Sequence, residues 1–322
     1  MNIELIDFDG KFPNLALMRL SAYHKAQGDR VVLLRGRQYK RLFDVPDRYY
    51  LSCVFRWNRD DAIRTIDQLG DRCISGGTGL DIDSKLPYDV VEAQPDYSIY
   101  DCDYGVGFIS RGCIRSCPWC VVPRKEGNLK RVSTAAEIVG ERRKAVFLDN
   151  NFLALPEYQK DLEWLAEKQT IIDFNQALDA RLVDDKAASL LAKCKWYPGI
   201  RLSLDSEGMI KHVKRAVDNL AKYGVSPGSL RVFVLIGFHG YESDLERLFK
   251  LREWGVAPFP MGYRDNDTGK EPAKGWPIKI YKKYRRLILR MPHANSVWDD
   301  FREVVKGKVK NTEGLPMFEE LE

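Results

Sequence analysis

The stretch RGCIRSCPWC at residues 111–120 carries the strongest signal in this sequence. It places Cys113, Cys117 and Cys120 in a C-x3-C-x2-C spacing, with Trp119 directly before the last cysteine. Thiolates are soft ligands that hold iron–sulfur clusters, and a pure electron carrier ordinarily supplies four of them to a 4Fe-4S cluster. Three thiolates leave one iron open for a substrate or cofactor, by the logic of the open position on a catalytic zinc. The stretch therefore predicts a catalytic 4Fe-4S cluster.

This run resembles the signature of the radical S-adenosylmethionine (radical SAM) enzymes, and residues 121–127 extend the resemblance to uncharacterised family members from bacteria and phages. The resemblance implies that the open iron chelates the amino and carboxylate groups of SAM. It further implies that one electron from the cluster cleaves SAM, and that the 5′-deoxyadenosyl radical takes a hydrogen atom from a substrate. A reducing partner such as flavodoxin or ferredoxin is expected.

The alternatives to this interpretation are a zinc knot and three chance cysteines. Zinc usually takes a fourth Cys or His, and the nearest histidines in the sequence are His24 and His212. A hypothesis from another class is a non-enzymatic iron–sulfur or zinc protein that binds nucleic acid. That hypothesis predicts a fully ligated metal and no affinity for SAM.

Composition places the chain among ordinary globular proteins. Its 322 residues suffice for one large domain or two medium ones, and 44% of them are hydrophobic. No apolar stretch approaches the length of a membrane span, and the first residues lack the pattern of a signal peptide. Seven cysteines is an odd count that fits a reducing compartment better than a disulfide framework. We expect a cytoplasmic protein without a membrane partner.

Charge is unevenly distributed, although the net charge of +5 is small. Residues 263–311 hold thirteen Lys and Arg against six Asp and Glu, and residues 279–286 interleave basic and aromatic side chains. Such a face can meet phosphates, and it inclines the expected substrate toward a nucleotide or RNA. Helical spacing of the apolar residues favours the simpler interpretation, an amphipathic helix whose charges face water. Residues 266–322 are thus predicted to form a basic helical extension.

Residues 1–100 alternate between strand and helix patterns, which predicts a small doubly wound, Rossmann-like parallel sheet. The glycine run at residues 76–79 matches neither a dinucleotide fingerprint nor a P-loop, and a plain turn is the favoured explanation. The expected strands cover residues 2–8, 30–34, 49–55 and 71–75, and the expected helices cover residues 13–27 and 60–69.

Residues 101–265 repeat the alternation more regularly, and the resemblance implies a partial (β/α)6 barrel there. Active-site groups of such barrels lie at the carboxyl ends of the strands. The cysteine run follows the first of these strands directly. The expected strands are 104–109, 144–148, 171–175, 199–204, 231–236 and 257–261, and the expected helices are 135–144, 156–168, 185–193, 207–223 and 241–254.

The strand ends supply the candidate SAM contacts. Trp119 stiffens the cysteine loop and is placed to seat the adenine. Asp149, Asn150 and Asn151 follow the second strand, where the resemblance implies a contact to the methionine amine; an Asx turn is the alternative. The later strand ends add polar or backbone groups as candidate contacts to the ribose, carboxylate and adenine of SAM: Asp179, Arg181, Ser203, Asp205, Gly237 and Tyr263. At the third strand, a structural pair between Asp179 and Arg181 is the competing explanation.

A domain before a radical SAM barrel resembles two branches of the family. Cobalamin-dependent methyltransferases carry D-x-H-x-x-G after the first strand, whereas this chain has no histidine in residues 7–12. Methylthiotransferases carry three cysteines for a second cluster, and Cys53 comes too late in the domain for that pattern. Both branches stay as alternatives to an unassigned hydrogen-abstracting enzyme, and cobalamin is a disfavoured third cofactor.

Overall fold

The computed structural model describes residues 1–36 and 46–276, which adopt a mixed α/β fold with parallel sheets. The chain divides into two compact units. Of the described residues, unit 1 comprises Met1–Gln176 with Arg264–Lys270, and unit 2 comprises Ala177–Tyr263 with residues 271–276. The basic segment 279–286 lies outside the described residues. The domain limits expected at residues 100 and 265 stay predictions.

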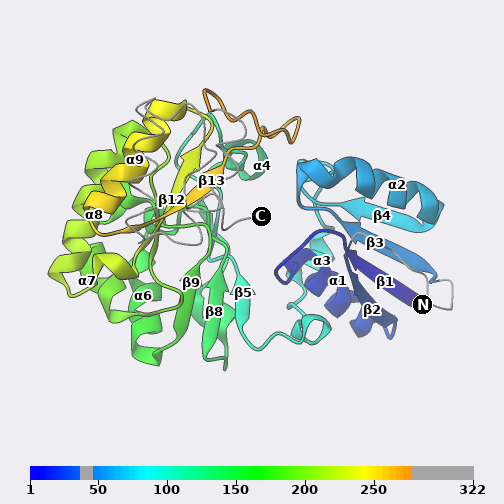
Figure 1. Cartoon of the computed structure of the whole chain (residues 1–322). Coiled ribbons are helices and arrows are strands. Elements are labelled where there is room, and N and C mark those ends of the chain that lie inside the picture. The colour runs from blue at the N-terminus through cyan, green and yellow to red at the C-terminus, as the bar shows by residue number, and fades with distance from the viewer. Residues whose placement is uncertain (37–45, 277–322) are drawn as a thin grey trace, which may run out of the picture. The chain divides into compact units, whose positions relative to one another are not determined.

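The first sheet of unit 1 has four parallel strands in the order β2-β1-β3-β4 (Figure 1). All four strands predicted for residues 1–100 are confirmed, within a few residues at each end. Parallel sheets need cover on both faces, and the helices supply it here. The strands are β1 (Asn2–Asp7), β2 (Arg30–Arg35), β3 (Arg48–Ser52) and β4 (Cys73–Gly76).

Alternation along β1 decides which side chains face which helix. Ile6 and Phe8 pack in the cluster that includes α2, while Ile3 and Leu5 pack in the cluster that includes α1. This is the two-residue period of a strand that is buried on both faces. The covering helices are α1 (Leu15–Ala26), α2 (Arg59–Leu69) and the short α3 (Tyr88–Glu92).

The glycine run after β4 is explained by close packing. Gly77 has φ of +101°, and a Cβ there would lie 2.3 Å from the carbonyl oxygen of Cys53. The N–H of Cys53 donates to the carbonyl of Gly76 at 3.0 Å. The run therefore presses the β4 turn against the segment after β3, which confirms the interpretation as a turn.

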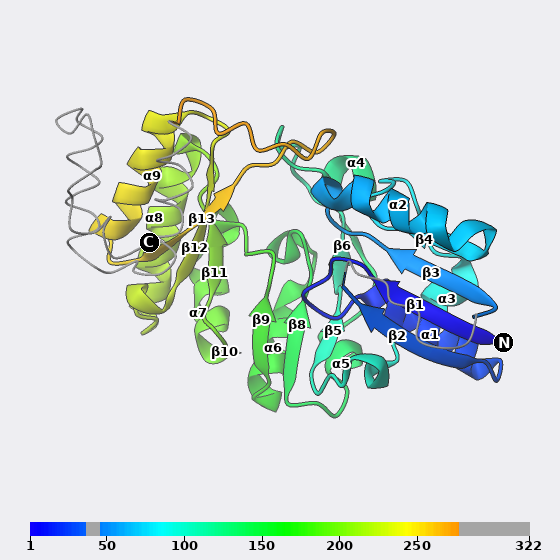
Figure 2. The same cartoon turned by 45° about the vertical axis from the view of Figure 1, so that its right-hand side comes forward.

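The rest of unit 1 holds three further parallel strands, with β8 between β5 and β9 (Figures 1 and 2). Phe147 of β8 and Phe174 of β9 stack with ring centroids 4.9 Å apart. Helix α5 is shorter than expected because Gly140 follows it with positive φ. The elements are β5 (Gly105–Gly107), β8 (Lys144–Phe147), β9 (Ile171–Phe174), α5 (Ala135–Val139) and α6 (Tyr158–Lys168).

Unit 2 places β12 between β11 and β13 in a parallel sheet. Helix α8 buries Val213, Ala216, Val217 and Leu220, the spacing of an amphipathic helix on a core. Strands and helices predicted for this region are confirmed, while their closure with β5, β8 and β9 into a partial barrel stays a prediction. The elements are β11 (Arg201–Ser203), β12 (Arg231–Ile236), β13 (Ala257–Gly262), α7 (Asp185–Lys193), α8 (Ile210–Lys222) and α9 (Tyr241–Glu253).

Within the described parts of the chain, helices that combine the length and the apolar character needed to span a bilayer are absent.

Candidate metal centre

A short antiparallel pairing closes the cysteine loop at its base. Strand β6 (Ser110–Arg111) pairs with β7 (Lys130–Arg131), and residues 112–129 form the loop between them. This loop contains the short helix α4 (Val122–Glu126), which follows the three cysteines. The three cysteines therefore belong to one closed loop that follows β5, as the predicted position at a strand end requires.

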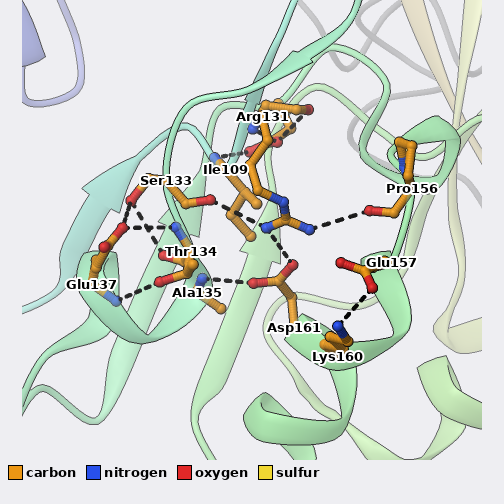
Figure 3. Close-up of polar contacts among 12 residues, drawn as sticks. Ile109, Arg131, Ser133, Thr134, Ala135, Glu137, Pro156, Glu157, Lys160 and Asp161 are labelled. Carbon is orange, nitrogen blue, oxygen red and sulfur yellow. Dashed lines mark hydrogen bonds and ion pairs between the residues drawn. The ribbon is translucent and has the colours of Figure 1, made fainter.

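Arg131 ties the base of the loop to the neighbouring helices (Figure 3). Its guanidinium donates to the buried Asp161 of α6 at 2.9 Å and to the carbonyl of Ser133 at 3.2 Å. Asp161 also accepts from the backbone N–H of Ala135, the first residue of α5, at 2.8 Å. A half-buried charge pair with additional donors holds its geometry better than a solvated one, so the loop starts from a fixed frame.

Gly112 makes the turn into the cysteines. Its φ is +81°, and a Cβ at this position would lie 2.2 Å from the carbonyl oxygen of Asn128. The N–H of Gly112 donates to Glu126 at 3.0 Å, and the N–H of Cys113 donates to the carbonyl of Gly127 at 3.2 Å. The two ends of the loop thus press together in a way that only glycine permits at this position.

Asp149, two residues beyond β8, binds the backbone that precedes the loop. Its buried carboxylate accepts from the N–H of Ile109 at 3.1 Å, and from the N–H and the hydroxyl of Ser110 at 2.5 and 2.7 Å. Burial raises the pKa of Asp149 to about 6, and the hydrogen bonds from Ser110 and Ile109 oppose that rise. In this structure the carboxylate holds β6 against β8.

The next two residues reach further along the same loop. Asn150 donates to Glu126 at 2.9 Å, and Glu126 also forms an ion pair with Arg111 at 2.7 Å. Asn151 donates from its side-chain nitrogen to the sulfur of Cys113 at 3.4 Å. Each residue of the run 149–151 therefore contacts the cysteine loop or the strand leading into it, and their expected contacts to SAM stay predictions.

The sulfur atoms accept several N–H groups. Besides Asn151, the backbone N–H of Arg115 donates to Cys113 at 3.3 Å, and that of Val122 donates to Cys120 at 3.5 Å. None of the seven cysteines, all of which are described, is in a disulfide. N–H donors directed at sulfur stabilise a thiolate, the form that binds metal. The donor set therefore fits a thiolate-ligated cluster.

The described residues contain no group of three His, Cys, Asp or Glu side chains gathered so that they could hold a metal ion. The 4Fe-4S cluster at the three cysteines therefore stays a prediction, and the zinc knot stays its alternative.

The segment 264–270 of unit 1 contacts the cysteine loop at Trp119 and Arg124. Asn266 donates to the carbonyl of Trp119 at 3.2 Å, and Asp267 forms an ion pair with Arg124 at 2.9 Å. Arg56, which follows β3, donates to the carbonyl of Asp267 at 3.0 Å. We call residues 264–270 the strap, because it joins the cysteine loop to the first sheet. The backbone of Trp119 is held by the strap, and its expected contact with adenine stays a prediction.

In unit 2, Asp179 and Arg181 bind each other. The Arg181 guanidinium donates to both carboxylate oxygens, at 2.7 and 3.0 Å, and its backbone N–H donates to Asp179 at 3.1 Å. This is the structural pair that was the competing explanation for these residues. A bidentate pair of this kind is geometrically well defined, and a role of either residue toward SAM stays a prediction.

The remaining candidates lie near the ends of β11, β12 and β13. Burial raises the pKa of Asp205 to about 6, against the lowering effects of Arg247, the Leu235 backbone and Ser203. Gly237 donates its N–H to Asp244 at 2.6 Å and accepts from the N–H of Lys274 at 3.0 Å.

The ring of Tyr263 lies edge-on to Phe238, with centroids 4.8 Å apart. In unit 2, Ser203 and Asp205 therefore contact each other. Gly237 directly follows β12, and Tyr263 directly follows β13. These residues and the cysteines belong to different units, so their convergence on one cofactor stays a prediction.

Three residues that matter in these networks were missed by sequence reasoning: Glu126, Asp244 and Asn266. Asp244 is fully buried and receives Gly237, the indole N–H of Trp276 at 2.7 Å, and the fully buried guanidinium of Arg247. Its spacing from Arg247 is that of an ordinary surface pair on a helix. Helix α9 (Tyr241–Glu253) carries many charged residues, so its sequence did not distinguish the buried Asp244 from the exposed ones.

Two carboxylates lie at the carboxyl end of β1, and both accept hydrogen bonds from other residues of unit 1. Asp7 is buried and accepts from the Tyr100 hydroxyl at 2.8 Å and from the N–H of Gly10 at 3.0 Å. Asp9 accepts from the N–H groups of Val54 and Phe55 at 2.8 and 3.0 Å. Burial raises the pKa of Asp7, with Tyr100 and Gly10 opposing. The bonds of Asp9 join the loop after β1 to the loop after β3.

No protein-family model matches the chain, and no curated protein matches it. A solved structure of a probable transcription regulator from Thermus thermophilus is similar at 13% identity, covering 92% of this chain and 91% of that chain, with a TM-score of 0.20. A TM-score this low carries no argument about fold or function.

Proposed function

We propose that the chain is a radical SAM enzyme in which Cys113, Cys117 and Cys120 bind a 4Fe-4S cluster. The observation that carries the proposal is the cysteine loop itself: three disulfide-free thiols in the C-x3-C-x2-C spacing, with N–H groups directed at the sulfurs of Cys113 and Cys120. When bound, the cluster would supply the electron that cleaves SAM reductively, leaving a 5′-deoxyadenosyl radical to abstract hydrogen from a substrate.

The chain's own residues have the task of holding and shielding this centre. Asp149 and Glu126 fix the entry to the loop, because they accept from the backbone N–H groups of Ile109, Ser110 and Gly112. The strap contacts the carbonyl of Trp119, directly before Cys120. A site that is held by buried and half-buried hydrogen bonds loses less entropy when it binds a cofactor. The candidate SAM contacts stay as predicted: Trp119, Asp149, Asn150, Asn151, Asp179, Arg181, Ser203, Asp205, Gly237 and Tyr263.

The substrate is unassigned: the basic composition of residues 263–311 inclines the proposal toward a phosphate-bearing molecule such as a nucleotide or RNA, with a peptide or small metabolite as the alternative. A flavodoxin or ferredoxin is the proposed electron donor, in the reducing cytoplasm. A cobalamin-dependent methyltransferase is disfavoured, because the glycine run after β4 is packed against Cys53 and the region after β1 holds no histidine.

Anaerobic reconstitution with iron and sulfide tests the proposal. We expect about four irons per chain and a broad visible absorption band, with a change in the electron paramagnetic resonance (EPR) spectrum of the reduced cluster when SAM is added. Cys113→Ala, Cys117→Ala and Cys120→Ala should each lose most of the iron. Cys73→Ala, a partly buried cysteine outside the loop, is the matched control and should keep it. Zinc without iron, or an EPR spectrum indifferent to SAM, would contradict the proposal.

A further inference from the structure

The side chain of Asn151 is placed unusually for a residue at the start of a helical turn. Asn151 precedes the 3₁₀ turn Phe152–Ala154 and is 2% exposed, yet its side chain makes no capping bond to that turn. Asparagine in this position ordinarily accepts from the first free N–H groups of the helix. Its amide nitrogen lies instead 3.4 Å from the sulfur of Cys113.

The neighbours of Asn151 already anchor the loop without it. Asp149 holds Ile109 and Ser110, and Asn150 holds Glu126. Asn151 differs from both because it contacts a sulfur atom. A thiolate can only accept, so the group that faces it must be the amide NH₂ and not the amide oxygen. Asn151 therefore donates a hydrogen bond to the sulfur atom that is the proposed cluster ligand.

We propose that Asn151 is a positioning residue for the cluster, whose amide N–H group stabilises the Cys113 thiolate and raises the reduction potential of the centre. The inference rests on the proposed function of the cysteine loop. Reduction adds negative charge to a cluster and its thiolates, and hydrogen bonds to the sulfurs favour the more negative state. Burial strengthens this effect, because a hydrogen bond in a low-dielectric site is electrostatically stronger than in water.

The test compares Asn151→Ala with Asn150→Ala, adjacent residues of one type of which only the first contacts sulfur. The reconstituted cluster is titrated with dithionite-poised mediators, and the reduced fraction is read from its EPR signal. At the wild-type midpoint, we expect the reduced-to-oxidised ratio in Asn151→Ala to fall about tenfold, a shift of about 59 mV for one electron. Asn150→Ala loses an anchor of the loop but no sulfur contact, so its ratio should fall much less than that of Asn151→Ala.

Three outcomes overturn the inference or its basis in distinguishable ways. A wild-type chain that takes up no cluster contradicts the proposed function and this inference together. A cluster that forms in Asn151→Ala and titrates like wild type contradicts the inference alone. Equal shifts in Asn150→Ala and Asn151→Ala would mean general loosening of the loop, which also contradicts it.

A second pair of variants decides the matter should Asn151→Ala assemble no cluster. Asn151→Asp keeps the size but turns a negative charge toward the thiolate, so the reduced-to-oxidised ratio should fall. Asn151→Gln keeps an amide donor and should fall less than Asn151→Asp. The aspartate is charged and lacks the N–H donor that the glutamine keeps. Equal reduced-to-oxidised ratios in the two variants would therefore contradict a donor role for Asn151.

Discussion

The carboxylate of Asp149 accepts hydrogen bonds from both the backbone N–H and the hydroxyl of Ser110, at 2.5 and 2.7 Å. Both residues are buried, and this contact joins the end of β8 to the strand that leads into the cysteine loop. Burial outweighs these bonds and raises the pKa of Asp149 from 3.8 to about 6. A carboxyl group whose pKa is raised by folding lowers the stability of the protein as the pH rises from the unfolded-state pKa to the folded-state pKa.

The stability of Asp149→Asn relative to wild type should therefore depend on pH. Below pH 4 the carboxyl is protonated in both folded and unfolded wild type, and the penalty is absent. Between pH 4 and pH 6 only the unfolded carboxyl ionises, so wild type should lose roughly 3 kcal/mol relative to the variant. Above pH 6 the difference should stay constant. Urea unfolding from pH 4 to pH 7 checks this, and a difference that does not vary with pH would contradict it.

Gly112→Ala should disrupt the entry to the cysteine loop. The new Cβ would lie 2.2 Å from the carbonyl oxygen of Asn128, in addition to the strain of positive φ. Gly127→Ala is the matched control, since Gly127 has φ of +69° and no atom within 4 Å of its Cβ. We expect about 1–3 kcal/mol of destabilisation from backbone strain in Gly127→Ala, and a larger loss in Gly112→Ala because the contact with Asn128 adds to the strain. Equal losses of stability and iron in the two variants would rule out the backbone contact as the cause.

Arg247→Met should be strongly destabilising at neutral pH. It leaves the fully buried Asp244 without the guanidinium that neutralises it, and unpaired buried charges cost about 3–5 kcal/mol. The loss should be smaller in acid, because burial already raises the pKa of Asp244 and a protonated carboxyl needs no counter-ion. Lys214→Met removes an exposed pair with Asp218 on α8 and should change stability little. Thermal unfolding of both variants at two pH values decides between these expectations.

Gly269→Ala should detach the strap from the first sheet. Gly269 has φ of +68°, and a Cβ there would lie 2.9 Å from the backbone nitrogen of Trp57. Gly224→Ala has comparable φ of +84° and open space around the Cβ, so it controls for strain alone. Limited proteolysis should cut Gly269→Ala faster than either the control or wild type within residues 264–270. Identical cleavage of all three proteins would show that the strap does not depend on this contact.

Strand and helix positions were predictable because burial imposes a clear apolar period. The alternation of Ile3, Leu5, Ile6 and Phe8 along β1 is an example. The pairing of β6 with β7 was not predictable, because each strand is only two residues long and all four residues are polar or charged. A pairing this short carries no hydrophobic period, and the pattern around it is that of a loop.

The candidate site was predictable in position more than in contacts. Sequence reasoning placed residues 149–151 beside the cysteine loop, since both follow adjacent parallel strands. It could not tell that Asp149 binds backbone or that Asn151 reaches Cys113, because strand-end placement does not fix where a side chain points. Glu126 was missed because a glutamate in a short polar helix has the same signature whether it faces water or backbone N–H groups.

The most direct test of the central claim is to incubate the reconstituted protein with SAM and dithionite without oxygen, and to measure 5′-deoxyadenosine by mass spectrometry. We expect product from wild type and from the Cys73→Ala control, and none above background from Cys113→Ala, Cys117→Ala or Cys120→Ala. Equal product from wild type and the three loop variants would contradict the claim. So would a wild-type protein that holds an intact cluster but neither binds SAM nor forms product.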